Sequence, residues 1–110
     1  MEIETEVAMI VLVTVPGMEE GERIAAILVG ERLAACVNLL HPVRSIYRWQ
    51  GKVQADDEVL LLIKTTAQRY AALERRVREV HPYEVPEVVA LRIERGSPPY
   101  LEWLRSETAE

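Results

Sequence analysis

Cysteine, histidine and phenylalanine are almost missing from this sequence of 110 residues, which has one cysteine, two histidines and no phenylalanine. The single cysteine, Cys36, excludes an intrachain disulfide and favours a reducing compartment. A closed zinc site needs about four Cys, His or carboxylate ligands. The chain has no CxxC or HxxxH pair, so one copy does not supply such a site by itself. The five glycines are scattered, which excludes a glycine-rich phosphate loop.

Basic charge and long apolar runs are scarce as well. The net charge is −5, and phosphate binding needs a concentrated excess of Lys and Arg, so no nucleic-acid partner is expected. The longest apolar run, residues 7–13, is far too short to cross a bilayer, and no membrane insertion is expected. The first six residues carry three acids and no base, unlike a secretory signal. These features predict a cytoplasmic protein.

What the chain does have is a regular alternation of strand and helix patterns. Runs rich in β-branched and apolar residues predict strands at 7–15, 35–49, 52–65 and 87–93. Helical spacing, turn signals and proline stops predict helices at 19–33, from the capping box 65–68 to His81-Pro82, and at 99–105. This β-α-β-β-α-β order with an added C-terminal helix predicts a single α+β domain over residues 1–110, with a ferredoxin-like antiparallel sheet.

The predicted strands lack a polar side. Residues 9–13 and 60–63 are apolar at every position, although two helices can cover only one face of the sheet. Leaving the other face in water would cost on the order of 10 kcal/mol per copy. The simplest cover is another copy of the same chain, so the pattern predicts a homo-oligomer. The predicted hairpin, residues 43–57, would overrun the other strands and offer Tyr47 and Trp49 to a partner.

Residues 81–87, His-Pro-Tyr-Glu-Val-Pro-Glu, are the best candidate metal site. They place an imidazole, a phenol and two carboxylates within a short stretch that two prolines stiffen. Imidazole with carboxylate suits first-row divalent ions, and Cu²⁺ binds such donors most tightly. His81, Glu84 and Glu87 are therefore candidate ligands. The same residues also serve structure, because His-Pro ends a helix, and composition alone favours that role.

Lys64 follows four apolar residues in a strand, where an ammonium group needs a carboxylate or a bound anion. A structural ion pair with Glu58 or Glu87 is the simpler interpretation. The alternative is an anion site at the cleft between copies. The wall of that cleft would be aromatic, formed by Tyr47, Trp49 and Tyr83.

No residue pattern predicts catalysis. Cys36 could form a thiolate–imidazolium pair with His41 or His81. Ala35 and Val37 flank it in an apolar strand, however, where a thiol usually only packs. The serines and threonines match no nucleophile elbow or triad signature, so no catalytic residue is predicted.

Five segments in order resemble the CutA family of divalent-cation tolerance proteins. These are ERLAACVN at 31–38, SIYRWQG at 45–51, LIKTT at 62–66, HPYEVPE at 81–87 and YLEWL at 100–104. The resemblance spans nearly the whole chain without large gaps. It implies a ferredoxin-like fold and a tight trimer, similar in architecture to the PII signalling proteins.

The resemblance also implies a non-enzymatic role in tolerance of divalent metals, with copper the usual ion. Members credited with copper binding have a cysteine near the end of the first strand and a doubled histidine before Pro-Tyr. This chain has Thr14-Val15 and Val80-His81 at those places, so only His81 carries over and weak copper binding is implied. Cys36 matches the second-strand segment and is expected to pack near the interface between copies. The alternative hypothesis is a PII-like sensor that binds a small anionic ligand between subunits.

Overall fold

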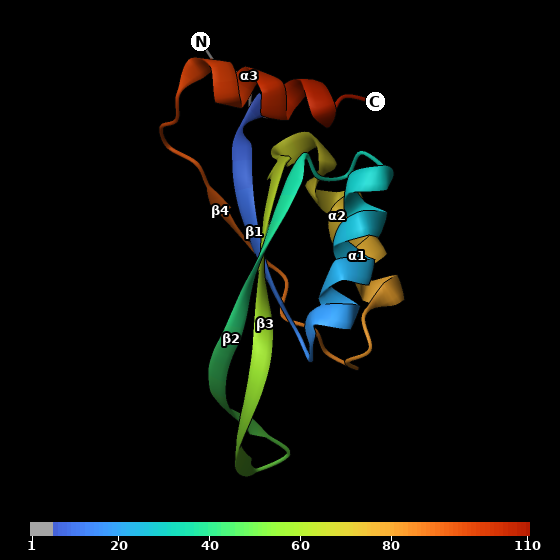
Figure 1. Cartoon of the computed structure of the whole chain (residues 1–110), viewed down its shortest axis with the longest axis vertical. Helices are drawn as coiled ribbons and strands as arrows, with labels where there is room; N and C mark the ends of the chain where they lie inside the picture. Colours follow the sequence, from blue (N-terminus) through green and yellow to red (C-terminus); the bar gives the residue numbers. More distant parts are fainter. Residues whose placement is uncertain (1–5) are drawn as a thin grey trace.

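Four antiparallel strands form one sheet in the order β2-β3-β1-β4 (Figure 1). The structure is a computed structural model that describes residues 6–110. Its elements are β1 (Ala8–Val15), α1 (Met18–Gly30), β2 (Cys36–Trp49), β3 (Lys52–Thr66), α2 (Ala67–Val80), β4 (Val89–Arg92) and α3 (Pro98–Glu107). This order confirms the predicted ferredoxin-like α+β fold with an added C-terminal helix. All but the last residue of the acidic N-terminal segment lies outside the described residues.

Two helix boundaries differ from those predicted. The capping box is wrong: α2 begins after Thr66, whose side chain makes no capping bond. The Thr65 hydroxyl instead donates to the Leu33 carbonyl at 2.7 Å, in the buried interior. Helix α1 ends at Gly30 rather than at residue 33, and Arg32 then takes a left-handed backbone with φ of 61°. That conformation turns the chain toward β2.

Helices α1 and α2 cover one face of the sheet (Figure 1). Alternate residues of β1 and β3 point to these helices and are fully buried: Val11, Val13, Val15, Val59, Leu61 and Ile63. Ile24 and Leu28 of α1 meet them from one side, and Leu73 and Val77 of α2 from the other. The helical periodicity of the sequence therefore supplies one half of the core and the strand alternation supplies the other.

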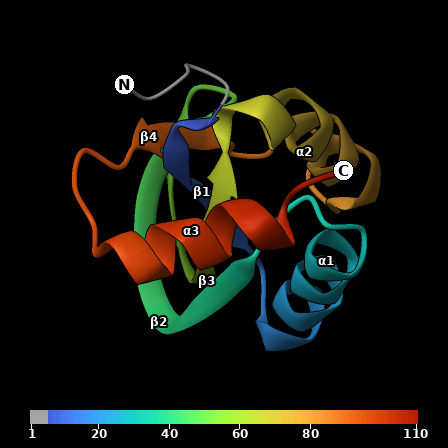
Figure 2. The same ribbon diagram turned by 90° about the horizontal axis from the view of Figure 1, so that it is seen from above.

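The second face of the sheet, here called the open face, carries apolar side chains that, within residues 6–110, are covered in part by α3 alone. Leu104 of α3 packs with Ala8 and Ala35 at one end of the sheet, where the helix crosses the strands (Figure 2). Farther along, Leu40 of β2 stays 43% exposed and Leu91 of β4 stays 56% exposed. The predicted absence of a polar side is confirmed, because apolar residues occupy both faces.

The paired ends of β2 and β3 form a long hairpin, residues 43–58, that projects beyond the helices (Figure 1). The molecule is accordingly elongated, measuring 47 × 25 × 22 Å. Ile46 and Val53 are 72% and 66% exposed on the hairpin. Within the described part of the chain, no helix is long and apolar enough to cross a membrane.

Two glycines of α1 provide a matched test of how tightly this helix packs on the sheet. A Cβ added at Gly21 would lie 3.0 Å from Leu39 Cδ2 and 3.3 Å from Val15 Cγ2, whereas one added at Gly30 would meet nothing within 4 Å. Alanine is better than glycine in a helix by about 0.5–1 kcal/mol. Crowding a packed core costs about 1–3 kcal/mol.

We therefore expect Gly30→Ala to raise the free energy of unfolding and Gly21→Ala to leave it unchanged or lower it. Urea unfolding of both variants beside the wild type measures the difference. An equal gain in both variants would contradict the close packing of α1 on β1 and β2.

Candidate functional site

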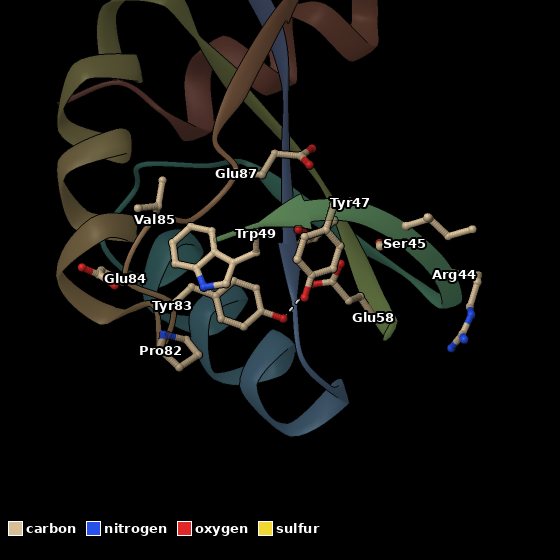
Figure 3. A pocket seen from close by; sticks show the side chains of 12 residues that line it. Arg44, Ser45, Tyr47, Trp49, Glu58, Pro82, Tyr83, Glu84, Val85 and Glu87 are labelled. Carbon is tan, nitrogen blue, oxygen red and sulfur yellow. Dashed lines mark hydrogen bonds between the residues drawn. The ribbon is translucent and has the colours of Figure 1, made fainter. Parts of the chain in front are cut away.

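A cavity of about 770 Å³ lies between the hairpin and the segment 82–87 that joins α2 to β4 (Figure 3). Its wall is built from aromatic and acidic side chains, including Tyr47, Trp49, Glu58, Tyr83, Glu84 and Glu87. The volume falls in the range of small-molecule pockets, about 300–1,000 Å³. The site therefore brings together two segments that stand more than twenty residues apart in the sequence.

A β-bulge at His41-Pro42 turns Tyr47 and Trp49 toward this cavity. Leu40 pairs with Leu60, but the next pair is Val43 with Glu58, so β2 gains one residue relative to β3. Side chains alternate along a strand, and one extra residue moves everything after it to the other face. Because of the bulge, Tyr47 and Trp49 lie on the same face of the hairpin as Glu58. Without the extra residue they would lie on the opposite face.

His81 fastens the segment 82–87 to the end of β1. Its Nδ1 accepts the backbone N–H of Tyr83 at 3.0 Å, and its Nε2 lies 2.7 Å from the Thr14 carbonyl oxygen. A nitrogen that accepts carries no proton, so Nε2 holds the proton of a neutral ring and donates it to Thr14. Both nitrogens of this buried imidazole are therefore engaged.

Tyr83 attaches the same segment to β3. Its hydroxyl donates to Glu58 Oε2 at 2.6 Å, and Glu58 is only 7% exposed. Burial raises the pKa of the Tyr83 phenol well above its ordinary value, and the hydrogen bond to Glu58 raises it further. Beside it, the Tyr47 hydroxyl donates to Asp56 Oδ2, and that bond raises the pKa of Tyr47. Each tyrosine hydroxyl thus donates a hydrogen bond to a neighbouring carboxylate.

Five of the predicted site residues line the cavity: Tyr47, Trp49, Tyr83, Glu84 and Glu87. His81, Lys64 and Cys36 do not. Lys64 and Cys36 face each other across β3 and β2, on the open face of the sheet. The predicted ion pair of Lys64 with Glu58 or Glu87 is wrong, because no carboxylate among the described residues pairs with Lys64. Glu58 lies six residues away along β3 and accepts the Tyr83 hydroxyl.

The three candidate metal ligands are not gathered into one cluster. In the part of the chain that the structure describes, no group of three or more His, Cys, Asp or Glu residues is placed to hold an ion. Figure 3 shows Glu84 and Glu87 directed away from each other. Since both ring nitrogens of His81 are engaged, this imidazole binds a metal only after one of its bonds opens.

Glu58 and Asp56 are site residues that the sequence did not indicate. Glu58 was predicted only as an ion-pair partner for Lys64. Their role depends on the strand register, in which Val43 pairs with Glu58 and Ser45 with Asp56. The available signal was the single extra residue at His41-Pro42, which sets that register.

The sequence model of the CutA1 divalent ion tolerance protein family matches residues 9–107. The divalent-cation tolerance protein CutA of Thermus thermophilus is 54% identical over 99 residues, covering 90% of this chain and 96% of that protein. The crystal structure of CutA1 from Oryza sativa superposes with a TM-score of 0.93 at 47% identity, covering 98% of this chain and 99% of that chain.

Two further relatives correct the predicted location. The Oryza sativa protein CutA 1, named chloroplastic, is 48% identical over 103 residues; the matched part is 94% of this chain and 58% of that longer protein. The periplasmic divalent cation tolerance protein CutA of Archaeoglobus fulgidus has a TM-score of 0.90 at 35% identity, over 93% of this chain and 99% of that one. Relatives are thus named for two other compartments, and the prediction of a cytoplasmic protein is wrong.

Because the pKa of Tyr83 is raised, the free energy of unfolding changes with pH in the alkaline range. The folded chain keeps the phenol proton at pH values where the unfolded chain, with its ordinary pKa of 10.0, releases it. The stabilisation is therefore fully present below pH 10 and is lost as the pH rises beyond that value.

We expect Tyr83→Phe to lower the free energy of unfolding near neutral pH. Its difference from the wild type should shrink as the pH rises from about 10 to 11. Urea unfolding across this range measures the difference. A constant difference at every pH would show that the Tyr83 hydroxyl is not held by Glu58.

Proposed function

The chain belongs to the CutA1 divalent ion tolerance protein family, and on this premise we propose that it serves divalent-cation tolerance as a non-enzymatic homotrimer that binds copper-type cations weakly. Family membership supports the role in tolerance. The trimer, the metal binding and the absence of catalysis are our proposals. The observation that carries them is a cavity lined by carboxylates beside an apolar sheet face that the single chain leaves uncovered.

The homotrimer would cover the open face and the hairpin side that carries Ile46 and Val53, opposite to Tyr47 and Trp49. Leu40, Val89 and Leu91 remain 43%, 47% and 56% exposed on the open face. Burying such side chains contributes about 25 cal/mol for each Å² of apolar surface removed from water. Identical copies provide a matching apolar surface without any other partner. The cavity lies beside the hairpin, so neighbouring copies would also bring donors to its rim.

Those additional donors matter for the metal. One copy contributes Glu84 and Glu87 to the cavity wall, and His81 stands directly before them, tied to Thr14. Because Glu84 and Glu87 point away from each other, we propose that one of them binds the ion first, together with donors of a neighbouring copy, and that His81 joins after exchanging its Thr14 bond for the ion. Breaking that hydrogen bond costs about 1 kcal/mol, which lowers affinity about fivefold. The proposed binding is therefore weak.

The alternative of a PII-like sensor for an anionic ligand has no specific observation in its favour. Lys64, its proposed anion contact, does not line the cavity. Arg44 does, but it pairs with Asp57 at 3.1 Å. Three carboxylates share that wall, and they would repel an anion.

The oligomer can be tested with two substitutions at equally exposed residues. Leu40 on the open face and Val29 on α1 are each 43% exposed. We expect the wild type to sediment as three copies of the 12.5 kDa chain. Leu40→Asp should dissociate or unfold, because a charge then lies in the interface. Val29→Asp should stay trimeric. A folded single copy of the wild type at low micromolar concentration would contradict the proposal.

Metal binding can be tested by calorimetry with Cu²⁺ on the wild type, on Glu84→Gln with Glu87→Gln, and on His81→Ala. We expect weaker binding in both altered proteins, because each loses proposed donors. Glu22→Gln on α1 and His41→Ala at the bulge are the matched controls and should bind like the wild type. Equal affinity of the wild type and His81→Ala would remove His81 from the site.

A further inference from the structure

Three aromatic side chains converge on the cavity without stacking on one another. Tyr47 and Trp49 come from β2, and Tyr83 comes from the segment after α2 (Figure 3). Among the described residues, the ring contacts are those of His81 with Tyr83 and of Tyr100 with Trp103. Tyr47 and Trp49 therefore have no ring partner, and they remain 42% and 40% exposed. Their faces are available to a ligand.

The charges around these rings are mainly negative. Glu58, Glu84 and Glu87 line the same cavity. The cationic side chain in the wall is Arg44, which pairs with Asp57 and points away from the aromatic group in Figure 3. Glu58 is the most buried of the acids at 7% exposure, and Figure 3 shows it near Tyr47 and joined to the Tyr83 hydroxyl by a hydrogen bond. The field inside the aromatic group therefore favours a cation.

The hydrogen bonds in the cavity wall also favour a cation over an anion. The hydroxyl protons of Tyr47 and Tyr83 go to Asp56 and Glu58, so neither is left to donate to an anion. A carboxylate accepts up to about four hydrogen bonds, and the bond from Tyr83 uses one of those places on Glu58. The wall is thus rich in acceptors and aromatic faces and poor in free donors.

We propose that this cavity binds a small organic cation, an alkylated ammonium group lying between Tyr47, Trp49 and Tyr83 with its charge toward Glu58. Aromatic faces attract such cations by about 0.5–2 kcal/mol each, and a neighbouring carboxylate adds to this. A cavity of about 770 Å³ is far larger than a metal ion needs, and aromatic carbons do not ligate one. This inference does not rest on the proposed role in metal tolerance.

The test uses choline and its uncharged isostere 3,3-dimethylbutan-1-ol, with a chelator present so that metal ions play no part. The chain has two tryptophans, and their indole N–H signals are separate NMR reporters. Trp49 lines the cavity, whereas Trp103 lies on α3 and serves as an internal control. Trp103→Phe assigns the two signals. We expect choline to shift the Trp49 signal saturably, to leave the Trp103 signal in place, and to bind at least about tenfold more tightly than the alcohol.

Glu58→Gln tests the charge with little change of shape, because the amide oxygen can still accept the Tyr83 hydroxyl. We expect it to weaken choline binding about fivefold or more, while Glu102→Gln on α3 leaves binding unchanged. Equal binding of choline and the alcohol to the wild type would overturn the proposal. So would a Trp49 signal that does not shift saturably with choline. Neither result depends on whether Cu²⁺ binds.

Discussion

The cavity exists because two side-chain hydrogen bonds tie the segment 82–87 to the sheet. His81 donates to the Thr14 carbonyl at the end of β1, and Tyr83 donates to Glu58 of β3. These bonds hold the segment against β1 and β3, and without them one wall of the cavity would be lost. The same bonds occupy the imidazole that the sequence proposed as a metal ligand. A single feature thus defines the pocket and engages both nitrogens of the candidate metal ligand His81.

The opposite wall of the cavity, formed by the hairpin, depends on a change of strand register. The surface around it carries apolar side chains that nothing described in the single copy covers. One additional residue in β2 places Tyr47 and Trp49 beside Glu58, on a hairpin that extends past the body of the molecule. The open face nearby leaves Leu40 and Leu91 exposed. The proposed trimer would cover the open face and the hairpin side opposite to Tyr47 and Trp49, and would thereby shield the apolar surface that a single copy leaves exposed.

The sequence predicted the fold well because its signals are local and repeated. The β-branched, apolar runs at 7–15 and 59–65, the helical spacing in α2 and the His-Pro stop each agree with the structure. The site was harder to predict, since it depends on contacts between distant residues. Nothing local indicates that Glu58 meets Tyr83 and not Lys64, or that the nitrogens of His81 are both engaged. The helix start failed for a related reason: Thr65 bonds to Leu33 across the core.

The bond between Tyr83 and Glu58 is the central claim, and a double-mutant cycle measures it most directly. The free energies of unfolding of Tyr83→Phe, Glu58→Leu, their combination and the wild type give the coupling energy of the pair, because neither altered side chain can form the bond. A hydrogen bond between a phenol and a partly shielded carboxylate should give a coupling of about 1 kcal/mol or more. Strictly additive effects would mean that the two residues do not hold the segment to the sheet, and the account of the cavity would fail.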